Sequence, residues 1–164
     1  MFISDEAFAQ LHQEFMLEHK AKLRMITDKN KTFNIAEVEK IIIDLKQWLK
    51  ENKNNNKTIA ILSMFNAQVD LITKVVQEVI SYEDIEKHNI HIGTANTAQG
   101  SEWDVIMFSW VMDNDCKHQS LTFANNPERL NVITSRGREK VINYYSKTNM
   151  GDCLLNRYLS SITE

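Results

Sequence analysis

The chain has 164 residues, of which 43% are hydrophobic and 25% charged, and its formal net charge is −3. This composition is typical of one globular domain, and the absence of an apolar run of about 18 residues argues against a membrane span. The acidic balance does not indicate a strongly basic nucleic-acid-binding domain, although a local basic groove is compatible with it.

The amino-terminal part of the chain predicts helices. Its first ten residues, MFISDEAFAQ, lack the basic and apolar regions of a secretory leader, so we expect a cytoplasmic protein. Residues 5–25 predict a first helix that does not fit the alternation farther along the chain. A clearer helix follows, because apolar residues recur at helical spacing up to a polar loop at Asn52: Val38, Ile41, Ile42, Leu45, Trp48 and Leu49. We expect a peripheral, unassigned helical segment at residues 1–33 and one domain at residues 34–164.

Strands and helices alternate over the rest of the chain. Apolar segments predict four strands, at residues 58–65, 90–94, 104–112 and 140–146. Helices are predicted at residues 66–80, with Asn66 as N-cap, near residues 127–135, and at residues 151–162. The segment 104–112 is nearly continuously apolar, as expected for a strand covered on both faces by helices. The alternation predicts an α/β fold, a three-layer domain with a mainly parallel sheet flanked by helices.

Three polar clusters adjoin the predicted strands, at residues 63–68, 94–102 and 126–138. In parallel α/β sheets, ligands bind outside the carboxyl ends of the strands. We therefore expect all three clusters to lie at that edge of the sheet.

The second cluster, TANTAQGSE, has a chemical logic for binding an anion. Gly100 has no Cβ, so backbone N–H groups can approach an anion closely, and Thr94 and Thr97 are short hydroxyl donors suited to phosphate oxygens. Glu102 would repel a triphosphate unless it pairs with an arginine or accepts a hydrogen bond from a ribose hydroxyl. The same residues also fit a plain turn between strands, in which Glu102 and Asp104 are solvated.

The third cluster, NPERLNVITSRGR, carries Arg129 and Arg136 on about the same helical face. Such a face usually lies in water or pairs with carboxylates. Alternatively, a guanidinium from this face could bind planar phosphate oxygens through its two-pronged fork. Spacing alone leaves both interpretations open.

The sequence contains no complete nucleotide or metal site. It has no G-x-x-x-x-G-K-[ST] phosphate loop, and no apolar strand ends in an Asp-Glu pair suited to Mg²⁺. Cys116 and Cys153 are too few for a disulfide framework or a zinc site, so we expect no bound metal. If a nucleotide binds, most of its contacts come from another domain.

Taken together, the clusters resemble the second RecA-like domain of superfamily-one helicases, in the branch that includes nonsense-mediated-decay and Okazaki-fragment-processing helicases. IAILSMFNAQVDLI is similar to motif IV of that family, TANTAQGSEWDVIMFSWV to motif V, and ERLNVITSRGREKVINYYS to motif VI. The order and spacing of the motifs also agree, from about Asn34 to the end of the chain. The resemblance implies a RecA-like domain of the P-loop NTPase class that itself lacks the P-loop.

The resemblance also implies an ATP site shared between two domains. Arg136 matches the motif VI arginine, a catalytic arginine finger on the γ-phosphate of ATP that is held with Mg²⁺ mainly by the first RecA-like domain. Gly100 and Glu102 match motif V residues at the ribose and γ-phosphate edge of the nucleotide, and Gln99 precedes them. Gln68 matches the glutamine of motif IV, so these four residues are expected to bind ATP.

Motif V is expected to contact nucleic acid as well. Thr94 and Thr97 match positions near the nucleic-acid backbone, where contacts position a strand without reading its sequence. The implied partners are single-stranded DNA or RNA and an N-terminal RecA-like domain of the same protein, with closure of the two domains around ATP. No membrane partner is implied. The implied function is the C-terminal motor domain of an ATP-dependent DNA or RNA helicase, which by itself does not hydrolyse ATP.

Departures from the family pattern surround the arginine finger. Glu128 stands where the family often has an arginine, and the residues flanking Arg136 differ from the usual ones: Thr134, Ser135, Gly137 and Arg138. These departures motivate an alternative, a degenerate helicase-like module that acts as a non-catalytic binding or interaction domain. An unrelated α/β domain with fortuitous motifs is the third interpretation.

Overall fold

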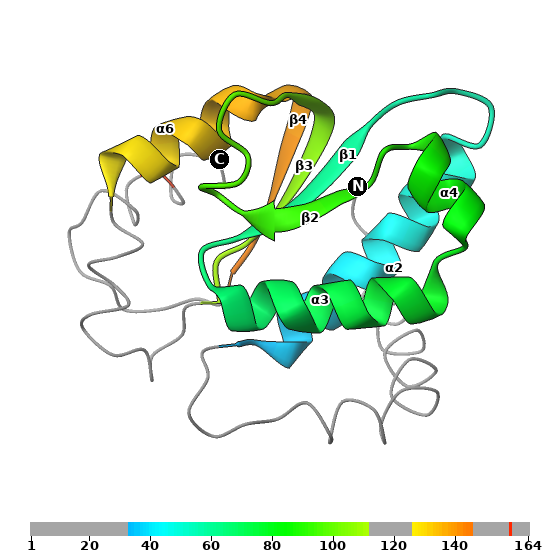
Figure 1. Cartoon of the computed structure of the whole chain (residues 1–164), viewed down its shortest axis with the longest axis horizontal. Coiled ribbons are helices and arrows are strands. Elements are labelled where there is room, and N and C mark those ends of the chain that lie inside the picture. The colour runs from blue at the N-terminus through cyan, green and yellow to red at the C-terminus, as the bar shows by residue number, and fades with distance from the viewer. Residues whose placement is uncertain (1–32, 112–125, 146–157, 159–164) are drawn as a thin grey trace.

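The computed structural model describes residues 33–111, 126–145 and 158. Its four parallel strands form one sheet in the order β2-β1-β3-β4, which confirms the predicted α/β class (Figure 1). The strands are β1 (Ile59–Ser63), β2 (His91–Thr94), β3 (Trp103–Ser109) and β4 (Gly137–Tyr144). The helices are α2 (Ile35–Glu51), α3 (Asn66–Val79), α4 (Tyr82–Lys87) and α6 (Pro127–Arg136). The helices predicted at residues 5–25 and 151–162 lie outside the described residues, apart from Tyr158.

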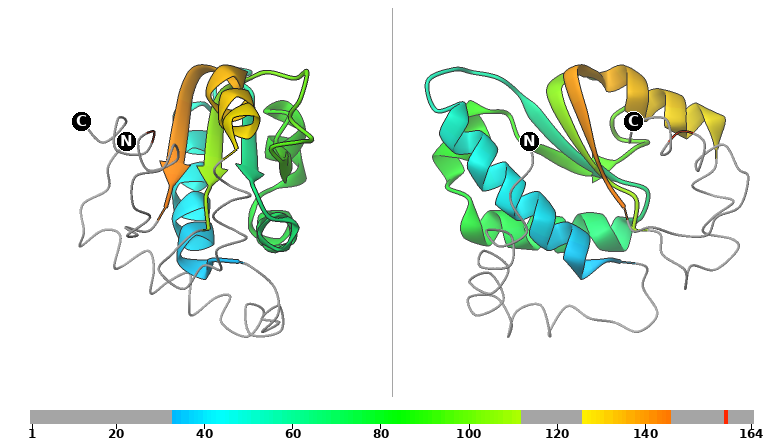
Figure 2. Two further views of the ribbon diagram at one scale, coloured as in Figure 1. Left: turned by 90° about the vertical axis from the view of Figure 1, so that its left-hand side faces the viewer. Right: turned by 180° about the vertical axis from the view of Figure 1, so that it is seen from behind.

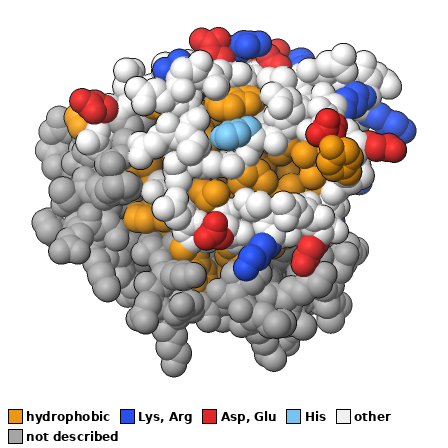
Figure 3. Space-filling model, in the orientation of Figure 1, with side chains coloured by type: hydrophobic (Ala, Val, Ile, Leu, Met, Phe, Trp, Pro, Cys, Tyr) orange, Lys and Arg blue, Asp and Glu red, His pale blue; other side chains and the backbone are white. Residues whose placement is uncertain are grey.

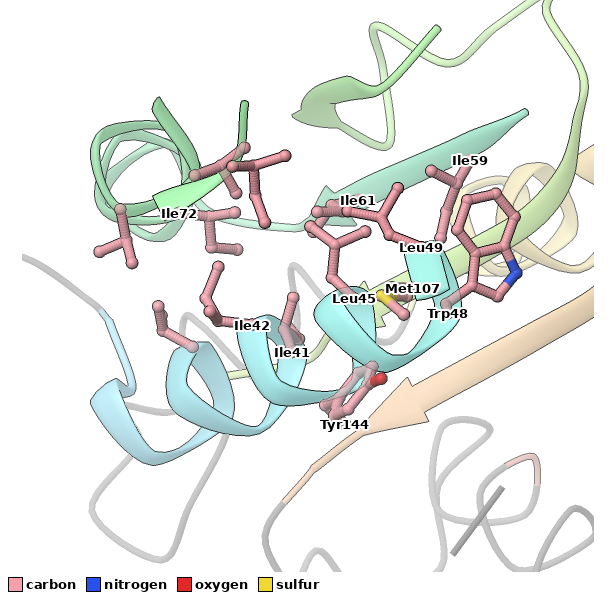
Figure 4. Close-up of a cluster of buried hydrophobic side chains, with 14 of the residues drawn as sticks. Ile41, Ile42, Leu45, Trp48, Leu49, Ile59, Ile61, Ile72, Met107 and Tyr144 are labelled. Carbon is pink, nitrogen blue, oxygen red and sulfur yellow. The ribbon is translucent and has the colours of Figure 1, made fainter. Parts of the chain in front are cut away.

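Helices α2 and α3 cover one face of the sheet (Figures 1 and 2). All six apolar residues predicted to line α2 are buried, and Asn52 ends the helix as expected. Alternate residues of β1 and β3 meet them, because successive strand side chains point to opposite faces: Ile59, Ile61, Val105 and Met107. Figure 4 shows this cluster between α2, α3 and the sheet. Burial of each large aliphatic side chain contributes about 1.5–3 kcal/mol, so this cluster anchors the sheet.

The opposite face of the sheet is covered by α6 and by the connection between β2 and β3. Leu62, Ile106 and Phe108 face this side and pack with Leu130 and Ile133 of α6. The sheet is therefore enclosed on both faces, as the nearly continuous apolar sequence of β3 predicts, and the domain has three layers.

The connection between β2 and β3 crosses this second face of the sheet. Both strands run parallel to β1, so the chain must return from the carboxyl end of one to the amino end of the other. Residues 95–102 make this return without a helix, and Ala95 and Ala98 are buried beneath it. As a result, the predicted motif V begins at the carboxyl edge of the sheet, reaches the amino edge at Glu102 and returns along β3 to the carboxyl edge.

Strand β2 forms one edge of the sheet, and apolar side chains are exposed on the face of the molecule around it (Figure 3). Figure 3 shows a band of hydrophobic side chains across this side, with charged side chains toward its margins. Tyr82 of α4 is 74% exposed, the largest exposed apolar side chain among the described residues. Within the same part of the chain, no helix has the length and apolar run needed to cross a membrane.

Several boundaries differ from the prediction: β1 ends at Ser63 and not at residue 65, and β3 ends at Ser109 and not at residue 112. Asn66 is the first residue of α3 and not its N-cap; the cap is Phe65, which is extended and supplies no side-chain bond. Strand β4 begins at Gly137, before the predicted residue 140, because Gly137 pairs with Trp103 at the start of β3.

Helix α4 was not predicted, since the polar segment 81–89 has no apolar stripe. It forms because Ser81 caps it: the Ser81 hydroxyl accepts a hydrogen bond from the Asp84 N–H at 3.2 Å. Its carboxyl end is held by His88, whose Nδ1 lies 2.7 Å from the Lys57 carbonyl oxygen.

Candidate functional site

The structure divides the three predicted clusters between the two edges of the sheet. Residues 63–68 follow β1 and lie at the carboxyl edge, as predicted. The third cluster ends at the amino edge, because α6 enters β4 from its amino end, so the expectation of one common edge was wrong. Strand β3 has 7 residues, so the two edges are about 20 Å apart.

Motifs V and VI meet at the amino edge. Trp103 pairs with Gly137 in adjacent strands, which places Glu102 beside the Gly137 segment and its two flanking arginines, Arg136 and Arg138. The structure thus brings together the two segments that carry the predicted γ-phosphate contacts. The pairing of β3 with β4 brings these segments together without a ligand.

A charged group surrounds this junction. Arg138 Nε lies 3.4 Å from Glu102 Oε2, and Arg138 Nη1 lies 3.7 Å from Asp104 Oδ1. The side chains of Glu102 and Arg138 are 53% and 57% exposed, so solvent screens their attraction and the pair contributes little to stability. Glu102 therefore has the arginine neighbour that the sequence analysis required beside a phosphate.

Asp104 is more firmly held than Glu102. The Thr58 N–H donates to Asp104 Oδ2 at 2.8 Å, and the Thr58 hydroxyl donates to the same oxygen at 3.1 Å. The backbone hydrogen bond from Thr58 is the main cause that lowers the pKa of the Asp104 carboxyl; the hydroxyl, Arg138 and Lys57 act in the same direction, and partial burial opposes them. Asp104 is thus a structural tie between β3 and the residue before β1.

Arg136 ends α6, immediately before Gly137. Its Nε atom is buried and has no hydrogen-bond partner among the described residues. Buried donors are usually satisfied, so this N–H has an unused capacity to donate, which a ligand could use only after the side chain moves. Ile133, one turn earlier in α6, is fully buried and fixes the direction of the helix at this point.

Gly100 lies in the connection with a left-handed backbone, at φ +85°. A residue with a side chain is strained in this conformation, so the chain needs glycine here. Apart from Gly100 and its two neighbours, no atom of the described residues lies within 4 Å of the position that a Cβ would take. The backbone at Gly100 therefore faces open space, where a ligand could approach it.

The two threonines of motif V form one turn. The Thr97 hydroxyl donates to the Thr94 carbonyl oxygen at 2.8 Å, and the Thr97 N–H donates to the same oxygen at 3.0 Å. Thr97 also lies over Gly93, where an added Cβ would collide with the Thr97 hydroxyl. The structure places Thr94 and Thr97 together but engages the hydroxyl proton of Thr97 internally, which leaves its oxygen as an acceptor.

Gln68 lies at the opposite edge, in a buried polar network. Its Nε2 donates to the Asn34 carbonyl oxygen at 3.0 Å and to Ser109 Oγ at 2.9 Å, and its Oε1 accepts from the Asn34 N–H at 2.8 Å. The side chain is fully buried. The structure therefore separates Gln68 from Gly100 and Glu102, and the predicted contact with ATP stays a prediction that would require these bonds to break.

The same network fills the crevice between the carboxyl ends of β1 and β3. Ligands of α/β proteins often bind at such a crevice, where successive connections go to opposite faces. Here Ser63 Oγ donates to the Ser109 carbonyl oxygen at 2.9 Å, and Ser109 Oγ donates to Glu37 Oε2 at 2.6 Å. Glu37 Oε2 also accepts from the N–H of Val111, whose φ of 68° is rare for a branched side chain. Side chains of the protein thus occupy the usual ligand crevice.

Gln99 lines a pocket rather than the amino edge itself. This pocket, about 140 Å³ in volume, lies between the connection and the first half of α6. Six residues line it: Ala95, Asn96, Gln99, Asn126, Glu128 and Val132. Sequence reasoning missed Asn96 and assigned Glu128 no role, because nothing in the sequence places residue 96 beside residue 128.

Two features of the described amino-edge residues are compatible with an anion. An unaccepted N–H on Arg136 and the open backbone at Gly100 both suit an anion. No group of three or more His, Cys, Asp or Glu side chains in residues 33–111 or 126–145 could hold a metal ion. The Cys116 segment lies outside the described residues.

Known proteins match this chain over the region that contains these sites. The sequence profile of a family described as an AAA domain matches residues 4–144. The chain is 31% identical over 105 residues to "Helicase required for RNAi-mediated heterochromatin assembly 1" of Schizosaccharomyces pombe, and 32% identical over 107 residues to "DNA polymerase alpha-associated DNA helicase A" of Saccharomyces cerevisiae. It is also 31% identical over 128 residues to "Putative regulator of nonsense transcripts 1" of Takifugu rubripes.

These matches cover most of the chain but little of each relative. The match to the Schizosaccharomyces pombe protein covers 64% of this chain and 10% of that protein. The match to the Saccharomyces cerevisiae protein covers 65% and 14%, and the match to the Takifugu rubripes protein covers 75% and 11%. The chain therefore spans about a tenth of the length of the curated relatives that it matches.

Proposed function

The chain belongs to the AAA domain family and is a second RecA-like domain of the superfamily-one helicases; on that premise we propose that it is the C-terminal motor domain of an ATP-dependent DNA or RNA helicase. The observation that carries this proposal is the meeting of motifs V and VI at the amino edge, through the pairing of Trp103 with Gly137. An N-terminal RecA-like domain would supply the phosphate loop and Mg²⁺ ligands, since these 164 residues contain no such loop.

Arg136 is the proposed catalytic residue. Bound ATP would supply the transferable γ-phosphoryl group, and phosphoryl transfer gathers negative charge on its oxygens. The Arg136 guanidinium is always protonated and presents donors in a planar fork, so it can neutralise that charge without changing its own protonation state. A positioned arginine of this kind accelerates phosphoryl transfer by about 10³-fold or more.

The rest of motif V would hold the nucleotide and the strand. Gly100 leaves its backbone open to an anion, and Glu102 would accept a hydrogen bond from the ribose while Arg138 offsets its charge. Thr94 and Thr97 would contact the phosphate backbone of a single strand, as contacts independent of sequence. Because one connection carries both sets of residues, a change at the nucleotide would shift the grip on the strand.

The test measures ATP hydrolysis by this chain joined to, or mixed with, the domain that supplies the P-loop. Arg136→Ala should lower the turnover number about 10³-fold while ATP binding changes little, since the ground state is held mainly by the other domain. Lys140→Ala is the matched control, because Lys140 is an exposed basic residue of the adjacent strand β4. Unchanged turnover in Arg136→Ala would refute the assignment of the arginine finger.

A second candidate function is a helicase-like module that binds without catalysis. It is favoured by the ion pair between Glu102 and Arg138, because that pair already engages the carboxylate assigned to the nucleotide. The two functions differ in one result: a motor domain hydrolyses ATP when the P-loop domain and a single strand are present, whereas a binding module does not.

A further inference from the structure

The pocket beside motif V has the lining of a site for a small polar ligand. We call it the amide pocket, lined by Ala95, Asn96, Gln99, Asn126, Glu128 and Val132, with a volume of about 140 Å³. Two of its described lining residues are apolar, Ala95 and Val132, and both are at least partly buried. Its rim is polar, because Asn96, Gln99 and Glu128 are exposed. The lining is therefore mainly polar, with a small apolar part.

The polar groups at the rim are available to a ligand. The structure records no hydrogen bond or ion pair that engages the side chains of Asn96, Gln99 or Glu128. Glu128 is held in place by its backbone instead, whose N–H donates to Asn126 Oδ1 at 2.9 Å. Two amides and one carboxylate can therefore both donate and accept at the mouth of the pocket.

The charge of the described lining residues does not favour a phosphate or carboxylate ligand. None of the six lining residues is a lysine or an arginine, and the Glu128 carboxylate would repel an anion. A neutral, planar molecule with donors and acceptors on its edges suits the lining better. A nucleobase has these properties: a flat face for Ala95 and Val132, and polar edges for the amides and Glu128.

The pocket also lies where a strand would pass. Asn96 stands between Thr94 and Thr97, the residues proposed to contact the phosphate backbone, and Ala95 is fixed to the end of β1 by its N–H bond to the Ser63 carbonyl oxygen at 3.2 Å. A strand held by its phosphates at the two threonines would bring its bases next to this wall. Single-stranded nucleic acids are commonly bound with unstacked bases in such pockets.

We propose that the amide pocket receives one unstacked nucleobase of the bound strand and prefers a base with an exocyclic amino group. This inference rests on the proposed binding of a single strand. The Glu128 carboxylate can only accept hydrogen bonds, so it favours cytosine, which offers the N4 amino group, over uracil, which presents the O4 acceptor at the same position. Motif V would thus add a base preference to contacts that otherwise read no sequence.

The experiment titrates the isotopically labelled 164-residue chain with three single strands of equal length: oligodeoxycytidine, oligodeoxyuridine and a strand of abasic sites. The side-chain amide signals of Asn96 and Gln99 report pocket occupancy by nuclear magnetic resonance. Oligodeoxycytidine should bind about 10-fold more tightly than oligodeoxyuridine and shift both signals, because one good base contact contributes about 1–3 kcal/mol of discrimination. The abasic strand should leave both signals in place.

Glu128→Gln tests the carboxylate directly. A glutamine amide can donate as well as accept, so the preference for cytosine over uracil should fall to about twofold or less. Glu139→Gln is the matched control, since Glu139 is an exposed carboxylate of β4 that pairs with Lys57 and lies outside the pocket. It should keep the full preference. A backbone spectrum of Glu128→Gln that matches the original chain establishes that the variant is folded.

The outcomes separate this inference from the proposed function. If no strand shifts any signal up to about 1 mM, the chain does not bind single strands and the nucleic-acid part of the proposed function is wrong, together with this inference. If all three strands bind equally and the amide signals stay in place, strand binding stands and the base pocket is refuted. A cytosine preference that survives Glu128→Gln would likewise overturn the assignment to Glu128.

Discussion

Arg136 and Arg138 flank one glycine, yet their surroundings differ. Arg138 extends from the start of β4 beside two carboxylates, those of Glu102 and Asp104. Arg136 ends α6 with a buried Nε that no described residue accepts. The change from helix to strand at Gly137 separates the two side chains, so Arg138 pairs with carboxylates within the domain, whereas Arg136 is the arginine that we propose to act on a ligand. Sequence spacing alone could not make this distinction.

The carboxyl of Asp104 makes the stability of the domain depend on pH. Its pKa is lowered in the folded state, chiefly by the Thr58 N–H, so the folded protein binds this proton less readily than the unfolded chain does. Asp104 therefore stabilises the fold above the ordinary aspartate pKa of about 3.9, and this contribution is lost as the pH falls through the lower folded value. The variant Asp104→Asn should be less stable than the original chain at about pH 7, and the difference should shrink at about pH 3.

Urea unfolding at the two pH values measures this difference. Glu139→Gln serves as the control, because its exposed pair with Lys57 contributes little at either pH. A deficit of Asp104→Asn that is the same at both values would show that the charge of Asp104 does not stabilise the fold.

At the scale of elements, the sequence predicted the strands and the α2 helix well because burial alone determines them. The apolar stripe of α2 leaves water when the segment forms a helix packed on the sheet. The apolar run of β3 leaves water when the segment forms a strand covered on both faces. The pattern of apolar residues could not predict the cap that starts α4 or the edge of the sheet at which each polar cluster lies. Ser81 starts α4 through a local hydrogen bond, and the position of motif VI follows from α6 entering β4 at its amino end. The predicted common edge for all clusters failed for this second reason.

The buried network around Gln68 should be costly to disturb. Gln68→Leu keeps the size of the side chain but removes its three hydrogen bonds to the Asn34 backbone and to Ser109 Oγ from a buried network, so the free energy of unfolding should fall by about 2–3 kcal/mol. Gln77→Leu is the matched control on an exposed position of the same helix, where a change within about 0.5 kcal/mol is expected. Chemical denaturation compares the two variants, and equal stability of both would mean that the network contributes nothing.

At the scale of the whole molecule, the strand order β2-β1-β3-β4 determines which residues meet at each edge of the sheet. The carboxyl-edge crevice is filled by Ser63, Ser109, Gln68 and Glu37, whereas Glu102 and Arg136 lie at the amino edge. The resemblance to helicase motifs identified these residues, since they carry the family signature. Neither the resemblance nor the residue pattern could predict the amide pocket, because it is formed by the packing of the connection against α6.

The isolated chain should not hydrolyse ATP. It has no phosphate loop, and no group of acidic side chains in its described part could hold a metal ion. Purified protein should therefore release phosphate no faster than buffer in the presence of Mg²⁺ and a single strand. A preparation of Arg136→Ala controls for contaminating enzymes. Turnover that is present in the original chain and absent from this variant would show that the chain has a complete site of its own.

The most direct test of the central claim compares two ligands of the assembled two-domain protein, ADP and ADP–aluminium fluoride, a mimic of the phosphoryl group in transfer. An arginine finger acts on the transition state more than on the ground state. Arg136→Ala should therefore weaken binding of ADP–aluminium fluoride by about 10²-fold or more and change ADP binding less than about twofold, whereas Lys140→Ala should change neither. If Arg136→Ala binds ADP–aluminium fluoride as tightly as the original protein does, Arg136 is not an arginine finger and the account of a shared ATP site is wrong.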